Sequence, residues 1–289
     1  MLQELRNLFE SGGYAVYGLL VQEEGETVLA LGDCAARHPV YSATKSFTAT
    51  AAGMLQDAGK WSVDDPLAAY LPREAVEGMP PGKREAFRLL PISRFLTMSV
   101  PGYSFRPEGE DWLAFALSCP AEYAGAAVFS YSNIPAYLVG LAAGNAAGEP
   151  LSDYLRRELL VPLGIESPVF RTDPQGRFYG ATGMELSVEE LSRLGRLYMQ
   201  DGLWNGKRLF SGSWAEAAVR PQIDAGKGQG YGYFFWAGLR DFSVSGKWGQ
   251  KCLVYPGRKL IISWEGEMPE TSGKFERAVR QLVSDGGDR

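Results

Sequence analysis

The hydrophobic positions at the start of the chain change from a helical period to a strand period. Within residues 1–10, apolar side chains recur at the spacing of an amphipathic helix. Residues 14–21 and 27–31 are rich in β-branched and aromatic side chains, and a turn at 23–26 separates them. We therefore expect an N-terminal helix followed by a β-hairpin.

The middle of the chain has the hydrophobic period of helices, interrupted by Pro and Gly loops. The first long helix is expected over residues 42–58. Farther along, residues 151–160 and 187–200 give the clearest helical patterns. Ser187 and Glu190 have the spacing of a capping box, in which each side chain accepts a hydrogen bond from the other residue's backbone N–H.

Strand patterns return in the last quarter of the chain. Pro256 and Gly257 predict a turn between the last two strands. A closing helix is expected over residues 272–283, and residues 285–289 have the composition of a frayed tail. The expected strands are 231–236, 241–245, 251–255 and 259–264.

Strands at both ends of the chain and helices between them indicate the fold class. The pattern predicts an α+β (α/β) fold, in which an antiparallel sheet is built from both termini and is flanked by helices. A mainly helical domain is then inserted into the sheet domain. The predicted boundaries assign residues 1–60 and 205–289 to the sheet domain and residues 61–204 to the helical domain.

Composition excludes several classes of protein. The chain has 289 residues, of which 45% are hydrophobic and 22% charged, so it can bury a core and is not disordered. The net charge is −5 and the basic residues are scattered, which disfavours a nucleic-acid partner. The longest apolar stretch, 136–147, is too short to span a membrane. Because the N-terminus lacks the pattern of a secretory signal, we expect a cytoplasmic protein with no membrane partner. The oligomeric state has no signature in the sequence.

Cysteine and histidine usage narrows the chemistry. Cys34, Cys119 and Cys252 lie far apart without metal-ligand spacing, so we expect buried free thiols and neither a metal nor a cofactor. The chain has a single histidine, His38, which precedes Pro39 and is expected in a surface loop. If the protein is a hydrolase, its general base is therefore not histidine.

Ser42 and Lys45 form the first candidate pair for chemistry. They lie three positions apart near the start of a predicted helix, which places both side chains on one face. A desolvated lysine can lose its proton and act as a base toward a serine hydroxyl. Taken alone, the pair is equally consistent with a helix-capping serine beside a solvated lysine.

Two further segments carry candidate residues. Tyr131 and Asn133 precede a predicted helix, where a phenol could pass a proton and an amide could contact an ester or amide substrate. Lys247 and Gly249 lie between two predicted strands, where a cation would raise the local potential and a glycine would admit substrate to the backbone. Each segment alone is also explained as a loop: a capped turn in the first case and a hairpin connection in the second.

Together, in this order, the three elements resemble the serine β-lactamase and penicillin-binding-protein superfamily, in the branch of class C β-lactamases, DD-peptidases and family VIII esterases. The resemblance covers nearly the whole chain, and the order of expected strands and helices agrees with that fold. The segments that resemble its motifs are Asp64-Asp65-Pro66-Leu67, Phe95-Leu96-Thr97, Tyr131-Ser132-Asn133, Val161-Pro162-Leu163-Gly164-Ile165 and Gly246-Lys247-Trp248-Gly249-Gln250.

The resemblance implies a role for each candidate residue. Ser42 corresponds to the nucleophile that forms an acyl-enzyme, while Lys45 and Tyr131 correspond to a coupled pair that handles its proton. Asn133 is implied to contact the acyl side of the substrate, and Lys247 to supply positive charge. We expect this positive cluster to lower the pKa values of the phenol and of the buried ammonium together.

The last motif also implies the oxyanion hole and the type of substrate. The backbone N–H groups of Ser42 and Gln250 are implied to hold the oxyanion, and Trp248, Gly249 and Gln250 to line the substrate site. Penicillin-recognising relatives carry Thr or Ser where this chain has Trp248. We therefore expect an esterase or amidase with a small-molecule acyl substrate rather than an efficient β-lactamase.

Two other functions fit the same residues. A catalytically silent member of the fold could serve as a binding or sensing module. A transacylase would use the same serine and pass the acyl group to an alcohol instead of water.

Overall fold

The computed structural model describes residues 1–286, and the last three residues of the expected tail lie outside the described part. An antiparallel sheet of eight strands, in the order β2-β1-β12-β11-β10-β9-β8-β7, forms its centre. Its strands are β1 (Val16–Glu23), β2 (Glu26–Gly32), β7 (Ile223–Asp224), β8 (Gly230–Tyr231), β9 (Trp236–Ala237), β10 (Phe242–Ser245), β11 (Lys251–Tyr255) and β12 (Leu260–Gly266). Two small sheets pair β3 (His38–Pro39) with β4 (Glu185–Leu186), and β5 (Leu203–Trp204) with β6 (Lys207–Arg208).

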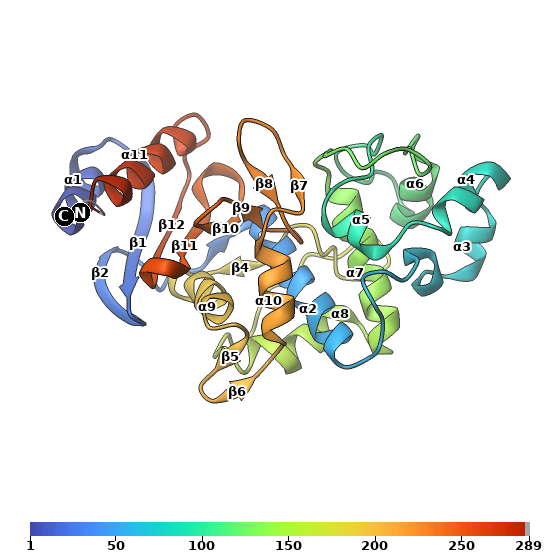
Figure 1. Ribbon diagram of the computed structural model, residues 1–289, viewed down its shortest axis with the longest axis horizontal. Helices are drawn as coiled ribbons and strands as arrows, with labels where there is room; N and C mark the ends of the chain where they lie inside the picture. Colours follow the sequence, from blue (N-terminus) through green and yellow to red (C-terminus); the bar gives the residue numbers. More distant parts are fainter. Residues whose placement is uncertain (287–289) are drawn as a thin grey trace.

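Helices cover the sheet and form the rest of the molecule (Figure 1). The α-helices are α1 (Leu2–Ser11), α2 (Thr44–Asp57), α3 (Arg73–Glu77), α4 (Pro81–Phe87), α5 (Ile92–Leu96), α6 (Trp112–Ser118), α7 (Asn133–Ala147), α8 (Leu151–Leu155), α9 (Val188–Met199), α10 (Gly212–Val219) and α11 (Ser272–Asp285). Short helical turns are η1 (Tyr41–Ala43), η2 (Leu67–Tyr70), η3 (Arg156–Leu160), η4 (Lys247–Gly249) and η5 (Pro256–Arg258).

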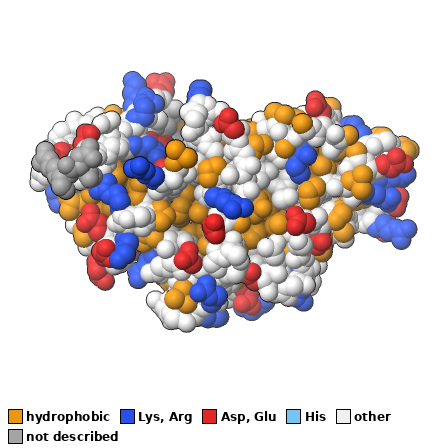
Figure 2. Space-filling view, viewed as in Figure 1, with side chains coloured by type: hydrophobic (Ala, Val, Ile, Leu, Met, Phe, Trp, Pro, Cys, Tyr) orange, Lys and Arg blue, Asp and Glu red, His pale blue; other side chains and the backbone are white. Residues whose placement is uncertain are grey.

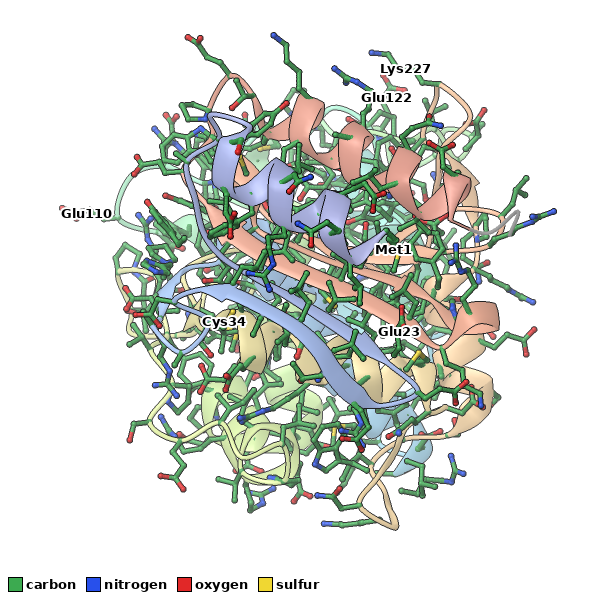
Figure 3. The ribbon with its side chains drawn as sticks, turned by 90° about the vertical axis from the view of Figure 1, so that its left-hand side faces the viewer. Met1, Glu23, Cys34, Glu110, Glu122 and Lys227 are labelled. Carbon is green, nitrogen blue, oxygen red and sulfur yellow. The ribbon has the colours of Figure 1, made fainter. Side chains whose placement is uncertain are left out.

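The sheet joins the two ends of the chain, as the sequence predicts. Strand β1 pairs with β2 on one side and with β12 on the other, in a register that matches Leu19 with Trp264. Helices α1 and α11 lie side by side over the outer face of the sheet (Figure 3). Alternate strand residues such as Val21 and Ile262 face these helices and form a separate hydrophobic core with Phe275. The predicted fold class is confirmed.

The opposite face of the sheet packs against helix α9, which contacts β1, β11 and β12. Helix α2 packs against α7 and connects the sheet to the helices α3–α6, at the far end of the molecule in Figure 1. The boundary predicted at residue 204 stays a prediction, although α9 lies before that boundary and contacts the sheet. On the face shown in Figure 2, hydrophobic side chains gather near the middle, with acidic and basic ones interspersed around them.

Two local expectations need correction, and a third, the helix over residues 151–160, is confirmed with a change of helix type in its second half. The predicted strand 231–236 is two short strands, β8 and β9, because Phe234 between them has a left-handed φ of 59° and its backbone bonds to Ser46 and Leu96 instead of a neighbouring strand. The predicted helix 151–160 changes from α8 to the π-helical turn η3. His38 is not in an open loop: it pairs with Leu186 in a two-stranded ladder and stacks on the Tyr17 ring at 4.2 Å.

Other local expectations are confirmed. Ser187 and Glu190 form both hydrogen bonds of the capping box at the start of α9. Cys34, Cys119 and Cys252 are buried free thiols. Among residues 1–286, no helix is long and apolar enough to cross a membrane.

Candidate active site

Ser42 lies in the turn η1, directly before helix α2. Tyr41 has a left-handed φ of 46°, so the chain bends sharply where it presents the serine. Two backbone contacts fix the approach to this bend. The Val40 N–H donates to the Met184 carbonyl, and the Val40 carbonyl lies so close to Gly246 that a Cβ there would be 2.1 Å from its oxygen. The glycine of the third motif therefore allows strand β10 to reach the serine segment.

Lys45 lies one turn into the helical segment and is the most deeply buried cation near the serine, with 1% of its surface exposed. Its Nζ is 3.1 Å from Ser42 Oγ, 2.6 Å from Asn133 Oδ1 and 2.9 Å from the Ala181 carbonyl oxygen. None of these partners carries a negative charge. Burial alone therefore lowers the pKa of Lys45 to about 7.

Tyr131 also contacts the serine, through a hydrogen bond to the Ser42 hydroxyl. The phenol ring is stacked on Trp236, with ring centroids 5.9 Å apart, and Lys45 Nζ is 5.0 Å from its centroid. Burial raises the pKa of Tyr131 to about 12, and the hydrogen bond to Ser42 offsets only part of that rise. The phenol is therefore protonated at neutral pH, contrary to the expectation that a positive cluster lowers its pKa.

Asn133 is brought to the lysine by the start of helix α7. Ser132 caps the helix by accepting a hydrogen bond from the Ile134 N–H, which places Asn133 at the first helical position. The Asn133 side chain is 7% exposed and hydrogen-bonds to both Lys45 and the hydroxyl of Tyr179. Ser42, Lys45, Tyr131 and Asn133 thus form one connected group, as their predicted roles require.

Lys247 is not part of this group. Its side chain is exposed, and its Nζ lies 3.9 Å from the ring centroid of its own neighbour Trp248. Burial lowers the pKa of Lys45 without a contribution from the second lysine, and the supply of positive charge by Lys247 stays a prediction.

The remainder of the third motif borders the serine through Trp248. Trp248 has a left-handed φ of 66° and contacts the Tyr41 ring edge to face, with centroids 5.3 Å apart. Gly249 has a φ of 109°, and a Cβ there would lie 2.4 Å from Met268. The Gln250 side chain bonds to the backbone of Gly266, so only its backbone remains for the predicted oxyanion contact.

The sequence matches the family described as Beta-lactamase over residues 5–264. The chain belongs to the Beta-lactamase family. A comparison with curated proteins finds no match.

Solved structures with low sequence identity share the fold of this Beta-lactamase family member. A Bacillus anthracis protein, provisionally described as a 6-aminohexanoate-dimer hydrolase, has a TM-score of 0.80 at 17% identity, covering 98% of this chain and 80% of its own. A class C beta-lactamase has a TM-score of 0.75 at 16% identity, covering 97% of this chain and 93% of its own. The penicillin binding protein from Bacillus halodurans has a TM-score of 0.72 at 16% identity, covering 98% of this chain and 100% of its own. At these identities the likeness establishes the fold.

Sequence reasoning missed two groups at the site of this Beta-lactamase family member. Ala181 contributes a backbone carbonyl to Lys45, and a backbone atom leaves no side-chain pattern to detect. Tyr179, two residues before Ala181, contacts Asn133. This segment is attached to α2, because Thr48 Oγ1 donates a hydrogen bond to the Gly180 carbonyl at 2.7 Å. Neither residue belongs to a motif, so tertiary packing alone reveals them.

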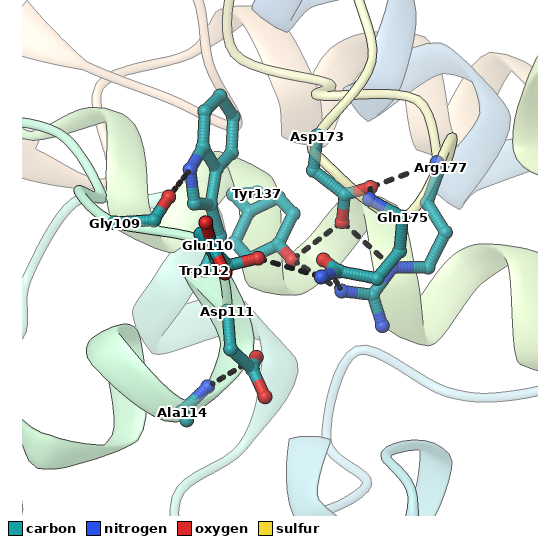
Figure 4. Close-up of polar contacts among 9 residues, drawn as sticks. All are labelled: Gly109, Glu110, Asp111, Trp112, Ala114, Tyr137, Asp173, Gln175 and Arg177. Atoms are coloured by element: carbon teal, nitrogen blue, oxygen red, sulfur yellow. Dashed lines mark hydrogen bonds and ion pairs between the residues drawn. The ribbon is translucent and has the colours of Figure 1, made fainter.

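A buried polar network fixes the loops around this segment (Figure 4). The Asp173 carboxylate accepts hydrogen bonds from the Tyr137 hydroxyl at 2.8 Å and from Arg177 Nε at 2.6 Å. Gln175 Nε2 reaches across to the Glu110 carbonyl at 2.6 Å, which ties the loop before α6 to the loop after residue 170. Trp112 packs edge to face on Tyr179, with centroids 4.7 Å apart, so the network also positions the residue that contacts Asn133.

Proposed function

We propose that the protein is a serine hydrolase that forms an acyl-enzyme with a small ester or amide. The observation that carries the proposal is the 3.1 Å contact between Lys45 Nζ and Ser42 Oγ, made by a buried lysine whose pKa is lowered to about 7. A general base is most effective when its pKa lies near the working pH and its nitrogen is within hydrogen-bond reach of the proton it removes.

The partners of Lys45 orient it for this role. A neutral amine has two N–H bonds and one lone pair. Asn133 Oδ1 and the Ala181 carbonyl are both acceptors and therefore take the two N–H bonds. The lone pair is then left for the hydrogen of the Ser42 hydroxyl. The same two acceptors stabilise the ammonium after it has taken the proton.

The reaction then follows in two halves. Lys45 takes the proton from Ser42, and Oγ forms a bond to the substrate carbonyl carbon. The tetrahedral intermediate collapses, the bond to the leaving group breaks, and the protonated Tyr131 donates its proton to the leaving atom; the Lys45 proton restores the phenol. Water, deprotonated by the same groups, releases the acid and frees Ser42. Proton transfers of this kind contribute about 100- to 10,000-fold in rate.

Trp248 supports an esterase or amidase rather than an efficient β-lactamase. Its indole contacts the Tyr41 ring and lies 3.9 Å from Lys247 Nζ, so the position between Lys247 and Gly249 presents an indole where penicillin-recognising relatives carry a hydroxyl. Phe129, Tyr131, Tyr231 and Trp236 form a second aromatic group next to the serine. Aromatic walls favour small uncharged leaving groups over a leaving group that carries a carboxylate.

The test combines covalent labelling with turnover. The intact protein is incubated with a fluorophosphonate, with p-nitrophenyl butyrate and with nitrocefin, and the adducts are read by intact mass. We expect one phosphonyl adduct and rapid ester turnover with little nitrocefin turnover, all lost in Ser42→Ala and retained in Ser213→Ala on α10. An intact protein that neither labels nor turns over ester would refute the proposal and favour a binding module.

A further inference from the structure

Four aromatic rings pack together beside Ser42, and they come from two separate parts of the chain. Phe129 and Tyr131 lie in the segment before α7, whereas Tyr231 belongs to β8 and Trp236 to β9. The centroids of every pair among the four rings are 5.0–6.4 Å apart. We call these four residues the aromatic wall. Tyr131 connects the wall to the nucleophile, because its hydroxyl is hydrogen-bonded to Ser42.

Two rings of the aromatic wall keep part of their surface exposed. Tyr231 is buried behind the others, with 1% of its surface exposed. Phe129 and Trp236 are only partly buried. The ring of Trp236 is nearly parallel to that of Tyr131, with 16° between the two planes. The wall therefore offers two accessible rings, each packed directly on the phenol that contacts Ser42.

Trp236 is held in place by backbone contacts to the helix that carries the proposed base. Ser46 Oγ donates a hydrogen bond to the Phe234 carbonyl at 2.8 Å, and the Phe234 N–H donates to the Leu96 carbonyl at 3.0 Å. Ser46 directly follows Lys45 in α2. The turn that precedes Trp236 is thus attached to α2, which fixes the strand carrying the indole relative to the reacting atoms.

The segment that carries Phe129 is fixed in the same manner. The Ser130 N–H donates to the Met98 carbonyl at 2.8 Å, and Arg94 Nη2 donates to the Ala126 carbonyl at 3.2 Å. Residues 123–133 contain no charged side chain, so an apolar molecule meets no desolvated charge along this segment. Rings on a fixed backbone lose less entropy on binding than rings on a mobile one.

We infer that the aromatic wall binds an aromatic ring of the substrate on Phe129 and Trp236, so that the preferred substrates are esters or amides with an aryl group close to the reacting carbonyl. This inference rests on the proposed function. Contact between aromatic rings, offset-stacked or edge to face, strengthens binding about two- to twelvefold beyond the effect of the buried area. A saturated ring of the same size buries similar area but lacks this additional attraction.

The test compares an aryl ester with its saturated counterpart on each side of the carbonyl. Ethyl phenylacetate is paired with ethyl cyclohexylacetate, and benzyl acetate with cyclohexylmethyl acetate, with acid release followed in a pH-stat. Each kcat/KM is divided by the rate constant for hydrolysis of that ester by hydroxide, which removes differences in intrinsic reactivity. We expect the aryl ester to be favoured by about three- to tenfold in one of the two pairs. That pair identifies whether the wall holds the acyl group or the alcohol.

Variants of the two accessible rings test whether the aromatic wall is the source of the preference. Phe129→Leu and Trp236→Leu keep an apolar side chain, so we expect the aryl preference to fall toward one while the saturated ester is still hydrolysed. Trp236→Phe restores a ring and should retain most of the preference. Trp204→Leu on β5, a partly buried tryptophan outside the wall, is the matched control and should keep the wild-type ratio.

The outcomes separate this inference from the proposed function. Turnover that is lost in Ser42→Ala but shows no aryl preference in either pair would overturn the inference and leave the hydrolase standing. An aryl preference that survives in both leucine variants would show that the ring binds elsewhere, which also overturns the inference. Absence of both turnover and fluorophosphonate labelling in the intact protein would overturn the inference and the proposed function together.

Discussion

Glu265 provides a test of the energetics of the fold that is independent of catalysis. It lies on strand β12, opposite Gly18 of β1, with none of its surface exposed. Within residues 1–286, neither of its carboxyl oxygens has a hydrogen-bond partner. Burial, together with the charge of Glu190, raises the pKa of Glu265 to about 9. Folding at neutral pH therefore requires this carboxyl to hold a proton that the unfolded chain has released.

The size of the effect follows from the two pKa values. The unfolded carboxyl has a pKa of 4.5, so at pH 7 the folded state is destabilised by about 1.4 kcal/mol for each of about 2.5 pH units, or about 3.5 kcal/mol. Because the folded pKa is the higher one, the stability is complete below pH 4.5 and declines as pH rises toward 9. Glu265→Gln keeps the shape of the side chain and removes its titration, so we expect the variant to be more stable by about 3.5 kcal/mol at pH 7.

The assay is urea unfolding followed by tryptophan fluorescence at several values between pH 5 and pH 8. The free-energy difference between Glu265→Gln and the wild type should grow by about 1.4 kcal/mol per pH unit across this range. Glu216→Gln on α10, where the carboxylate is 76% exposed, serves as the control and should show no such slope. A difference that does not change with pH would show that Glu265 is ionised in the folded protein, and the reasoning would be wrong.

Three other predictions concern the base, the loop network and the core. The rate of fluorophosphonate labelling should rise with pH through about 7 as Lys45 loses its proton. Lys45→Arg should lower this labelling rate at least about 100-fold at every pH. A wild-type labelling rate that does not change with pH would exclude this lysine as the base. Asp173→Asn should lower stability by about 3 kcal/mol in urea unfolding, because the guanidinium of Arg177 loses its buried partner; an unchanged midpoint would contradict this. Gly53→Ala should lower the free energy of unfolding by about 1–3 kcal/mol, because the new Cβ would lie 2.2 Å from the buried Trp214 ring. Gly82→Ala, whose new Cβ meets open space in α4, should instead raise the free energy of unfolding by at most about 1 kcal/mol. Equal effects of the two substitutions would show that Trp214 can move aside.

Hydrophobic periodicity predicts the architecture because the sheet has two buried faces and the helices cover them. The order of strands and helices, the capping box at Ser187 and the buried cysteines all follow from local pattern. The local pattern does not predict the conformation of residues 232–235. These four residues have the composition of a strand but are held in a turn by the hydrogen bonds of Phe234 to distant residues. A backbone that bonds to distant partners leaves no trace in its own composition.

Part of the candidate site is likewise predictable from the sequence, and part of it depends on tertiary contacts. Ser42, Lys45, Tyr131 and Asn133 come together because the first pair lies at the start of α2 and the second pair at the start of α7, as their motifs predict. Spacing also places Lys247 at the correct strand end, but its side chain turns onto the indole of Trp248. Rotamer choice at an exposed position depends on neighbours and solvent, which a motif does not encode. The catalytic roles themselves stay predictions until the labelling experiment is done.

The pairing of β1 with β12 has a consequence for biosynthesis. As the chain leaves the ribosome, the hairpin β1–β2 appears first, but its inner edge has no neighbour until almost the whole polypeptide has been made. An unpaired strand edge is prone to associate with other chains. Helices α1 and α11 pack against each other, so a circular permutant that joins them and opens the loop between β5 and β6 would translate β12 before β1, with only α11 and α1 between the two strands. Such a protein should depend less on chaperones during synthesis while keeping the same sheet.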